Sequence, residues 1–338
     1  MLTLRAVPGV GDIGVADRLA RYGSAEAAVA DLPVATRAVA AREADRVLAT
    51  LAEAGAAAVV LGDTRYPSRV RELRDAPPVL FLRGTNAVHQ PPAVAIVGTR
   101  AASAYGLRVA RAIAAVCARA GVAVISGLAR GIDAAAHEAT LEAGGRTVAV
   151  LGTGVDVYYP RTHRTLQERI ARDGLLVSEL APGDTGHSGT FPRRNRIIAA
   201  LADVTVVVEA GRGSGALITA DHALELGRTV ACVPNAIDLP SSLGSNALLK
   251  AGAEPLLAPD DVLALLKIDH VRLPGPSLDP LAARCWDAVS SGAREIVDIA
   301  RIAKLSTRET VAVLSALEID GLLSFDVAGA VRPTVGHL

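Results

Sequence analysis

From about residue 79 to residue 250, short continuous apolar runs alternate with longer segments of helical spacing. The apolar runs predict strands covered on both faces, because such strands are hydrophobic at nearly every position. The segments between them predict amphipathic helices. We expect strands at 79–83, 93–97, 122–125, 146–151, 174–178, 204–208 and 229–233. We expect helices at about 105–119, 132–143, 162–172, 194–201, 216–226 and 243–250.

This repeated order predicts an α/β fold, an extended Rossmann-like, doubly wound parallel sheet covered by helices. Ligands of such sheets bind beyond the carboxyl ends of the strands, at the switch point of the strand order. Glycine or turn residues follow each predicted strand from 93–97 onward. The loops at this edge are therefore the candidate site.

The segments on either side of the sheet predict two smaller domains. Residues 1–62 are alanine-rich and read as a helical domain. The turn at Pro8–Gly11 is typical of a helix-hairpin-helix element, although a bundle that uses the turn only for packing fits equally well. The sheet domain is expected at 63–268 and a Pro/Gly linker at 269–280. Residues 281–334 predict a winged helix, in which Ser306 and Glu309 form a capping box.

Charge restricts where a nucleic acid could bind. The chain has 35 basic and 35 acidic residues. Residues 1–62 and residues 281–332 each carry six basic and seven acidic residues. A nucleic-acid site must therefore be a local patch in the middle of the chain. For the winged-helix segment, this balance favours protein contact or packing over binding in a duplex groove.

The cysteines and the hydropathy predict a cytoplasmic protein. Cys117, Cys232 and Cys285 stand in apolar contexts without the spacing of metal ligands, so we expect reduced core cysteines and no metal. No apolar run reaches the roughly 18 residues of a membrane helix. The N-terminus lacks the apolar stretch of a signal peptide.

The loop from Gly98 to Ser103 is the first candidate anion site. Ser103 is a candidate N-cap, and we expect the backbone amides before it to face outward. Such amides suit an anion, and Arg100 adds a guanidinium that can bind it in a bidentate manner.

The usual nucleotide motifs do not fit. The sequence has no Gly-Lys dipeptide, which excludes a Walker A loop. Gly211–Ala216 matches the GxGxxA dinucleotide pattern. However, the next strand ends in Pro234-Asn235, without the acidic residue that binds the ribose. We therefore expect no cofactor.

Four carboxylates, Asp133, Asp156, Glu179 and Glu209, follow predicted strands or begin the next helix. They could act as acid and base, but the sequence shows no nucleophile–base pair or metal-ligand cluster. We expect them to accept hydrogen bonds from loop amides and arginines, and we expect no catalytic residue.

The second candidate site is a glycine-rich loop, 182–196, which ends in Phe191, Arg193, Arg194, Asn195 and Arg196. An aromatic ring beside several guanidiniums is typical of single-strand recognition, because the ring stacks on a base and the cations hold phosphates. Alternatively, Phe191 anchors the loop and the arginines pair with Glu179 and Glu209. The composition leaves both interpretations open.

The order of these motifs resembles the DNA-processing protein A family (DprA, or Smf). The resemblance runs from about Tyr66 to Leu257 and rests on AIVGTRAASAYG, SGLARGIDAAAH, VLGTGVDVYYP, FPRRNRIIAAL, VVVEAGRGSGALITADHALELGR and CVPN…GSNALLKAGA. It departs from the family pattern at Asn235, where the family usually has glycine.

This resemblance implies a function and a site. It implies a non-enzymatic mediator that binds and protects incoming single-stranded DNA, dimerises through the Rossmann-like domain and loads RecA during natural transformation. It assigns DNA contacts to the family motifs at Gly98, Thr99, Arg100, Phe191, Arg194, Asn195, Ser214 and Gly215. We add Ser126, Gly127, Arg193 and Arg196 as further expected DNA contacts.

Two other classes remain as alternatives. A Rossmann enzyme of the lysine-decarboxylase-like (LOG) type would hydrolyse nucleoside monophosphates, but its PGGxGTxxE signature is absent here. A winged-helix regulator would bind duplex DNA, which the acidic terminal domain disfavours.

Overall fold

The computed structural model describes residues 1–338 except 86–91, 269–277, 320–321, 327–328 and 334–338. The chain divides into two units, Met1–Asp269 and His270–Leu338, and each has its own apolar core.

The first unit is built on a nine-stranded sheet with the order β1-β2-β6-β5-β4-β3-β7-β8-β9. The strands from β6 to β9 in this order run parallel, whereas β2 is antiparallel to both β1 and β6. The predicted doubly wound α/β sheet is therefore confirmed. Its strands are β1 (Ala56–Val60), β2 (Val79–Gly84), β3 (Ala93–Val97), β4 (Ala123–Ser126), β5 (Thr147–Leu151), β6 (Leu175–Ser178), β7 (Val204–Val207), β8 (Thr229–Cys232) and β9 (Glu254–Pro255).

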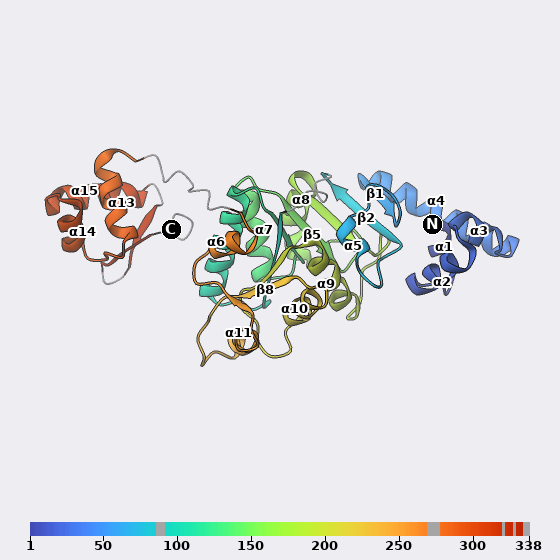
Figure 1. Ribbon diagram of the computed structural model, residues 1–338. Helices are drawn as coiled ribbons and strands as arrows, with labels where there is room; N and C mark the ends of the chain where they lie inside the picture. The colour runs from blue at the N-terminus through green and yellow to red at the C-terminus, as the bar shows by residue number, and fades with distance from the viewer. Residues whose placement is uncertain (86–91, 269–277, 320–321, 327–328, 334–338) are drawn as a thin grey trace. The chain divides into compact units, whose positions relative to one another are not determined.

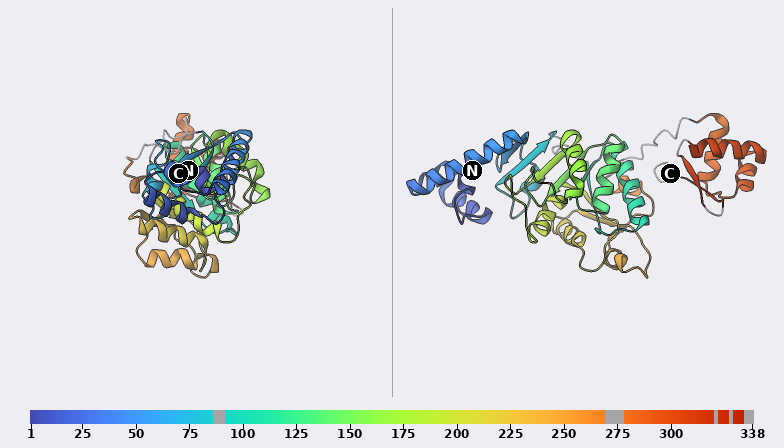
Figure 2. Two further views of the ribbon diagram at one scale, coloured as in Figure 1. Left: turned by 90° about the vertical axis from the view of Figure 1, so that its right-hand side faces the viewer. Right: turned by 180° about the vertical axis from the view of Figure 1, so that it is seen from behind.

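Helices cover both faces of the sheet (Figures 1 and 2). They are α5 (Ser68–Arg71), α6 (Ala104–Arg119), α7 (Ile132–Glu142), α8 (Arg164–Asp173), α9 (Thr190–Leu201), α10 (Gly215–Glu225), α11 (Leu243–Lys250) and α12 (Asp261–Leu265). Alternate residues of β3 enter different cores, because successive side chains of a strand point to opposite faces. Ala95 and Val97 pack with α9 and α10, whereas Val94 and Ile96 pack with α6 and α7.

Most predicted elements lie within two residues of their observed bounds, and β3 has the predicted bounds. Two differences matter. Residues 56–60 form β1, where the sequence predicts helix, and they pair with β2. Helix α9 begins at Thr190, four residues before the predicted start at 194, so Phe191 and Arg193 also lie on the helix and not in the loop.

The N-terminal helices are α1 (Leu2–Arg5), α2 (Asp12–Tyr22), α3 (Ala25–Ala30) and α4 (Val34–Glu53). They enclose a small core of their own around Leu4 and Val15. Leu51, near the end of α4, instead packs in a core that includes sheet residues such as Phe81. The last turn of α4 and strand β1 therefore connect these helices firmly to the sheet.

The second unit contains α13 (Pro280–Ser290), α14 (Ile296–Ala303), α15 (Thr307–Ile319) and a two-stranded antiparallel sheet of β10 (Leu323–Phe325) and β11 (Val331–Pro333). The predicted capping box before α15 is confirmed. The Ser306 Oγ accepts a hydrogen bond from the Glu309 amide, and the Glu309 carboxylate accepts one from the Ser306 amide. The winged-helix assignment stays a prediction.

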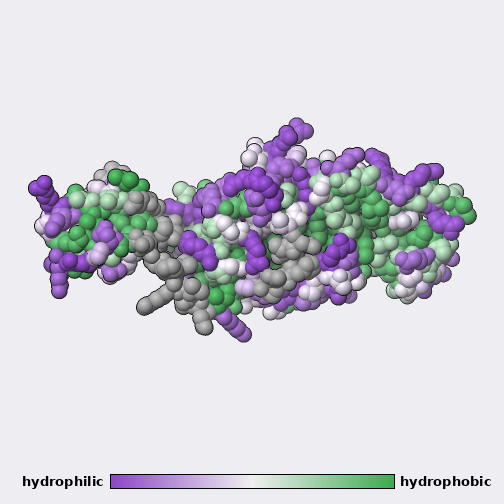
Figure 3. Space-filling model, turned by 90° about the horizontal axis from the view of Figure 1, so that it is seen from above, coloured by the Kyte–Doolittle hydropathy of each residue, from purple (hydrophilic) through white to green (hydrophobic). Residues whose placement is uncertain are grey.

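In the part of the chain described, no helix is both long enough and apolar enough to span a membrane. Exposed apolar side chains occur on α4, at Val34, Val39 and Leu48. Figure 3 shows apolar residues gathered over the N-terminal helices and polar residues over much of the remaining face.

A buried histidine in α7 gives the fold a predictable pH dependence. The Thr147 hydroxyl donates to the Val124 carbonyl, so it accepts a hydrogen bond from Nδ1 of His137 at 2.7 Å. Nε2 of His137 has no hydrogen-bond partner within the described residues. Burial lowers the pKa of His137 from its ordinary value of 6.5 to about 3.

Below pH 6.5, His137 binds a proton in the unfolded chain but stays neutral in the folded protein. This difference lowers the free energy of unfolding as the pH falls toward 3. His137 changes the free energy of unfolding by at most about 1.4 kcal/mol per pH unit. We expect urea denaturation of His137→Asn to show a flatter pH dependence than the wild type, while the exposed His187→Gln control keeps the wild-type slope. Equal slopes for His137→Asn and the wild type would contradict this assignment.

Candidate nucleic-acid interface

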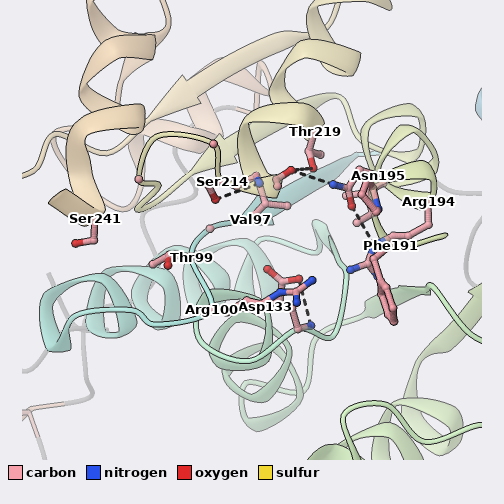
Figure 4. A pocket seen from close by; sticks show the side chains of 18 of the residues that line it. Val97, Thr99, Arg100, Asp133, Phe191, Arg194, Asn195, Ser214, Thr219 and Ser241 are labelled. Carbon is pink, nitrogen blue, oxygen red and sulfur yellow. Dashed lines mark hydrogen bonds between the residues drawn. The ribbon is translucent and has the colours of Figure 1, made fainter. Parts of the chain in front are cut away.

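The strand order reverses between β3 and β7, which makes this pair the switch point of the sheet. The chain continues from β3 into α6 on one face and from β7 into α10 on the other. A pocket of about 390 Å³ opens between the two loops, as expected for a doubly wound sheet. Figure 4 shows Phe191 and Asn195 on one side of this pocket and Thr99 and Ser241 on the other.

The pocket brings together eight of the twelve predicted DNA-binding residues: Gly98, Thr99, Arg100, Phe191, Arg194, Asn195, Ser214 and Gly215. The other four do not line it. Ser126 is buried and its hydroxyl donates to the Ile96 carbonyl at 2.6 Å. Gly127 lines an adjoining depression, and Arg193 lines a separate pocket beside the N-terminal helices. Arg196 is buried away from the pocket.

Several backbone amides between Gly98 and Ser103 donate hydrogen bonds within the protein, whereas the sequence predicted that they face outward. The Thr99 amide donates to the Glu209 carbonyl at 2.7 Å, and the Ala101 amide donates to the Thr99 hydroxyl at 3.2 Å. Both the amide and the hydroxyl of Ser103 donate to the Glu209 carboxylate. The amides of Thr99, Ala101 and Ser103 therefore do not face outward, contrary to the prediction. Ser103 is the N-cap of α6, as predicted, because its hydroxyl accepts a hydrogen bond from the Gly106 amide at 3.0 Å, and Glu209 in turn binds Ser103. Thr99 and Arg100 still reach the pocket with their side chains.

All four strand-edge carboxylates hold loops or arginines, as predicted. Asp133 accepts hydrogen bonds from the amides of Gly127 and Ala129, Asp156 from that of Gly183, and Glu209 from Ser103. Glu179 forms an ion pair with Arg196.

Arg194 is a buried structural cation. One of its terminal nitrogens donates to the carbonyls of Gly127 and Val150, and Nε donates to the Asn195 side chain at 3.0 Å. The guanidinium lies so close to Gly127 that a Cβ there would come within 2.3 Å of it, so a larger residue would displace the Arg194 side chain. Burial lowers the pKa of Arg194 to about 10, although the nearby Asp133 acts in the opposite direction. Arg194 is therefore still a cation at neutral pH.

Arg193 and Arg196 also pair within the protein. Arg196 binds Glu179 and Asp75, each at 2.8 Å, and its side chain is 5% exposed. Arg193 binds Asp12 of α2 at 2.7 Å and lies 3.5 Å from Glu179. Acidic side chains pair with both arginines, and the expectation that they contact DNA phosphates stays a prediction. Glu179 pairs with arginines as the alternative interpretation expected, whereas Glu209 binds Ser103, the N-cap of α6.

Phe191 forms one wall of the pocket. Its ring is half-buried and packs against Gly152, where a Cβ would come within 2.6 Å of the ring. The guanidinium carbon of Arg100 lies 6.0 Å from the ring centroid, within the range of a cation–π contact. A flat ring and a cation therefore border the same cavity.

Two pocket arginines are exposed, Arg100 and Arg212, and neither forms an ion pair with a described residue. Arg212 is absent from the sequence-based site. It lies within the GxGxxA segment, in which the glycine pattern indicates a dinucleotide site but does not identify the arginine. Its position directly beyond a strand at the switch point is the signal that would have identified it.

Among the described residues that line the pocket there is no histidine, and the one carboxylate, Asp133, already accepts two amide hydrogen bonds. Within the described ranges, no group of three or more His, Cys, Asp or Glu side chains could hold a metal ion. The free cations and the ring can bind an anion joined to a flat group.

The fold and this pocket define the general class: a doubly wound α/β protein with a cationic pocket at its switch point. Residues 57–267, more than half of the chain, match the family described as DNA recombination-mediator protein A. The chain belongs to this family, as the order of its motifs predicts.

Relatives and solved structures agree. Protein Smf of Synechocystis is 44% identical over 208 residues, which cover 60% of this chain and 52% of that protein, so the chain spans about half of its length. A putative DNA processing protein DprA of Mycobacterium tuberculosis is 42% identical over 267 residues, 75% of this chain and 68% of that protein.

DprA of Streptococcus pneumoniae matches the structure with a TM-score of 0.66 and 34% identity, over 78% of this chain and 95% of that one. DprA of Helicobacter pylori, whose structure is described for its single-stranded DNA binding mode, matches with a TM-score of 0.57 and 29% identity. That match covers 63% of this chain and 95% of that one.

The distinction between buried structural arginines and pocket-facing arginines can be tested by measuring the free energy of unfolding of single variants. Arg196→Ala leaves Glu179 buried without its closest cation, and we expect a loss of about 3 kcal/mol in unfolding free energy. Arg100→Ala removes an exposed side chain and should change stability by no more than about 0.5 kcal/mol. Urea denaturation of both variants measures the difference. Equal losses would contradict this distinction.

Proposed function

We propose that this protein binds single-stranded DNA at the switch-point pocket. The observation that carries the proposal is the convergence of two exposed arginines, Arg100 and Arg212, with the half-buried Phe191 ring on one cavity. A guanidinium can hold a phosphate, and an aromatic ring stacks on any base.

The remaining pocket residues act as supports in this proposal. Asn195 donates to the Gly215 carbonyl at 2.9 Å and accepts from Arg194, so it joins α9 to the start of α10. The Ser214 hydroxyl caps α10 by accepting from the Ala216 amide. The positive end of the α10 dipole therefore lies at the pocket, where it favours an anion.

Two features favour a single strand over a dinucleotide or a duplex. The pocket has no free carboxylate for a ribose hydroxyl, because Asp133 is engaged by loop amides. A stacking wall at Phe191 can be used by an unpaired base, whereas the bases of a duplex are already stacked. The H. pylori relative, described for binding single-stranded DNA, supports the same assignment.

We further propose the role that family membership implies: a non-enzymatic mediator that protects incoming single strands and loads RecA during natural transformation. The three cysteines are free and buried, as expected of a protein that works in the cytoplasm. No feature of the pocket favours the nucleoside-monophosphate hydrolase.

Removal of one pocket group at a time tests the binding site. Arg100→Ala should weaken binding of oligonucleotides of every sequence and lower the salt slope of the affinity by about one. Phe191→Ala should cost about 1–3 kcal/mol with little change in salt slope, because stacking releases no counterions. Filter binding at several salt concentrations measures both effects.

Arg46→Ala is the matched control, because it removes an exposed arginine from α4, away from the pocket. It should leave affinity and slope unchanged. If Arg100→Ala has the affinity and salt slope of the wild type, the pocket is not the phosphate site.

We also propose a homodimer formed through the Rossmann-like domain. Large apolar side chains are exposed around α11, notably Ile237 at 87% and Leu257 at 81%. We take these exposed apolar side chains as part of the dimer interface, because apolar surface left open to solvent favours association. Light scattering should give the mass of a dimer for the wild type and of a monomer for the double variant Ile237→Glu/Leu257→Glu. Leu48→Glu, on α4, should remain a dimer. A monomeric wild type, or a dimeric double variant, would contradict this interface.

A further inference from the structure

A second depression, of about 490 Å³, adjoins the switch-point pocket. The two share Arg100, Ala129, Phe191 and Arg194, so together they form one continuous groove along the carboxyl edge of the sheet. The second depression lies over the loops that follow β4 and β5.

An aromatic platform extends from the first depression into the second. The ring of Tyr159 packs against that of Phe191 with centroids 4.8 Å apart and an interplanar angle of 37°. Tyr159 as a residue is 47% exposed, although its ring packs against Phe191. The neighbouring Tyr158 is engaged instead, because its hydroxyl donates to Glu168 and Arg164 lies over its ring.

Two further cations border this platform. Arg130, in the loop after β4, and Arg161, after β5, both line the second depression and are exposed. Within the described part of the chain, neither forms an ion pair or a side-chain hydrogen bond. This differs from Arg193 and Arg196, which acidic residues neutralise. The groove thus repeats the combination of an exposed ring with free guanidiniums.

We propose that the second depression is a further nucleotide subsite, in which a base stacks on Tyr159 and Arg130 and Arg161 hold the adjoining phosphate. The bound strand runs from the switch-point pocket across Phe191 to the loops after β4 and β5. This inference rests on the proposed binding of single-stranded DNA at the first pocket and adds the path of the strand.

The test is the dependence of affinity on oligonucleotide length. We would titrate wild type, Tyr159→Ala and Tyr159→Phe with oligothymidylates from about 2 to 12 nucleotides, a range that spans one small single-strand site. The shortest oligonucleotides fill only the first pocket, so they should bind wild type and Tyr159→Ala equally. Longer ones should bind Tyr159→Ala about 5- to 150-fold more weakly, as expected for the loss of one stacked base.

The other variants separate stacking from folding and charge. Tyr159→Phe keeps the ring and should retain wild-type affinity at all lengths. Arg161→Ala should weaken only the longer oligonucleotides and lower their salt slope. Tyr22→Ala, which removes a tyrosine from α2, should match wild type throughout.

Two failures are distinguishable. If Tyr159→Ala and wild type show the same affinity at every length while Arg100→Ala binds more weakly, the second subsite is wrong and the first pocket stands. If Arg100→Ala also matches wild type, the proposed function itself is wrong.

Discussion

One buried cation holds the walls of the switch-point pocket together. Arg194 donates to carbonyls at the ends of β4 and β5 and to Asn195, which in turn donates to the Gly215 carbonyl after β7. The loop after β4, strand β5 and the start of α10 are thereby fixed to α9. Phe191 lies one helical turn before Arg194, on the same side of α9, so the buried guanidinium also determines where the aromatic wall stands.

This arrangement explains why a chain of zero net charge can carry a cationic groove. The arginines of α9 are neutralised by Asp133, Glu179, Asp75 and Asp12, and Glu209 binds Ser103 at the N-terminus of α6. The arginines on the loops, Arg100, Arg130, Arg161 and Arg212, have no such partners within the described residues. The arginines of α9 are therefore compensated inside the protein, whereas these four line the groove proposed for the strand.

Much of the fold could be predicted, because continuous apolar runs identify buried strands whatever their neighbours. β1 could not, since its alanine-rich sequence favours helix and it becomes a strand only by pairing with β2. The start of α9 was also missed, although Pro192 is tolerated in a first helical turn. The order of the motifs predicted that Arg100 and Phe191 lie at the same edge of the sheet, and both line the switch-point pocket. The sequence leaves open whether Arg194 and Arg196 pair inside the protein or face DNA, because it indicates Glu179 as a partner but not Asp75, which comes from a distant segment.

The measurement that tests the central claim most directly is photo-crosslinking of a bromouracil-substituted single strand to the full chain, with the adducts located by mass spectrometry. The account predicts adducts in the peptides that carry Phe191 and Arg100, at the carboxyl edge of the sheet, and their loss when unlabelled single strands compete. Adducts confined to the N-terminal helices or to α13–α15 would contradict it.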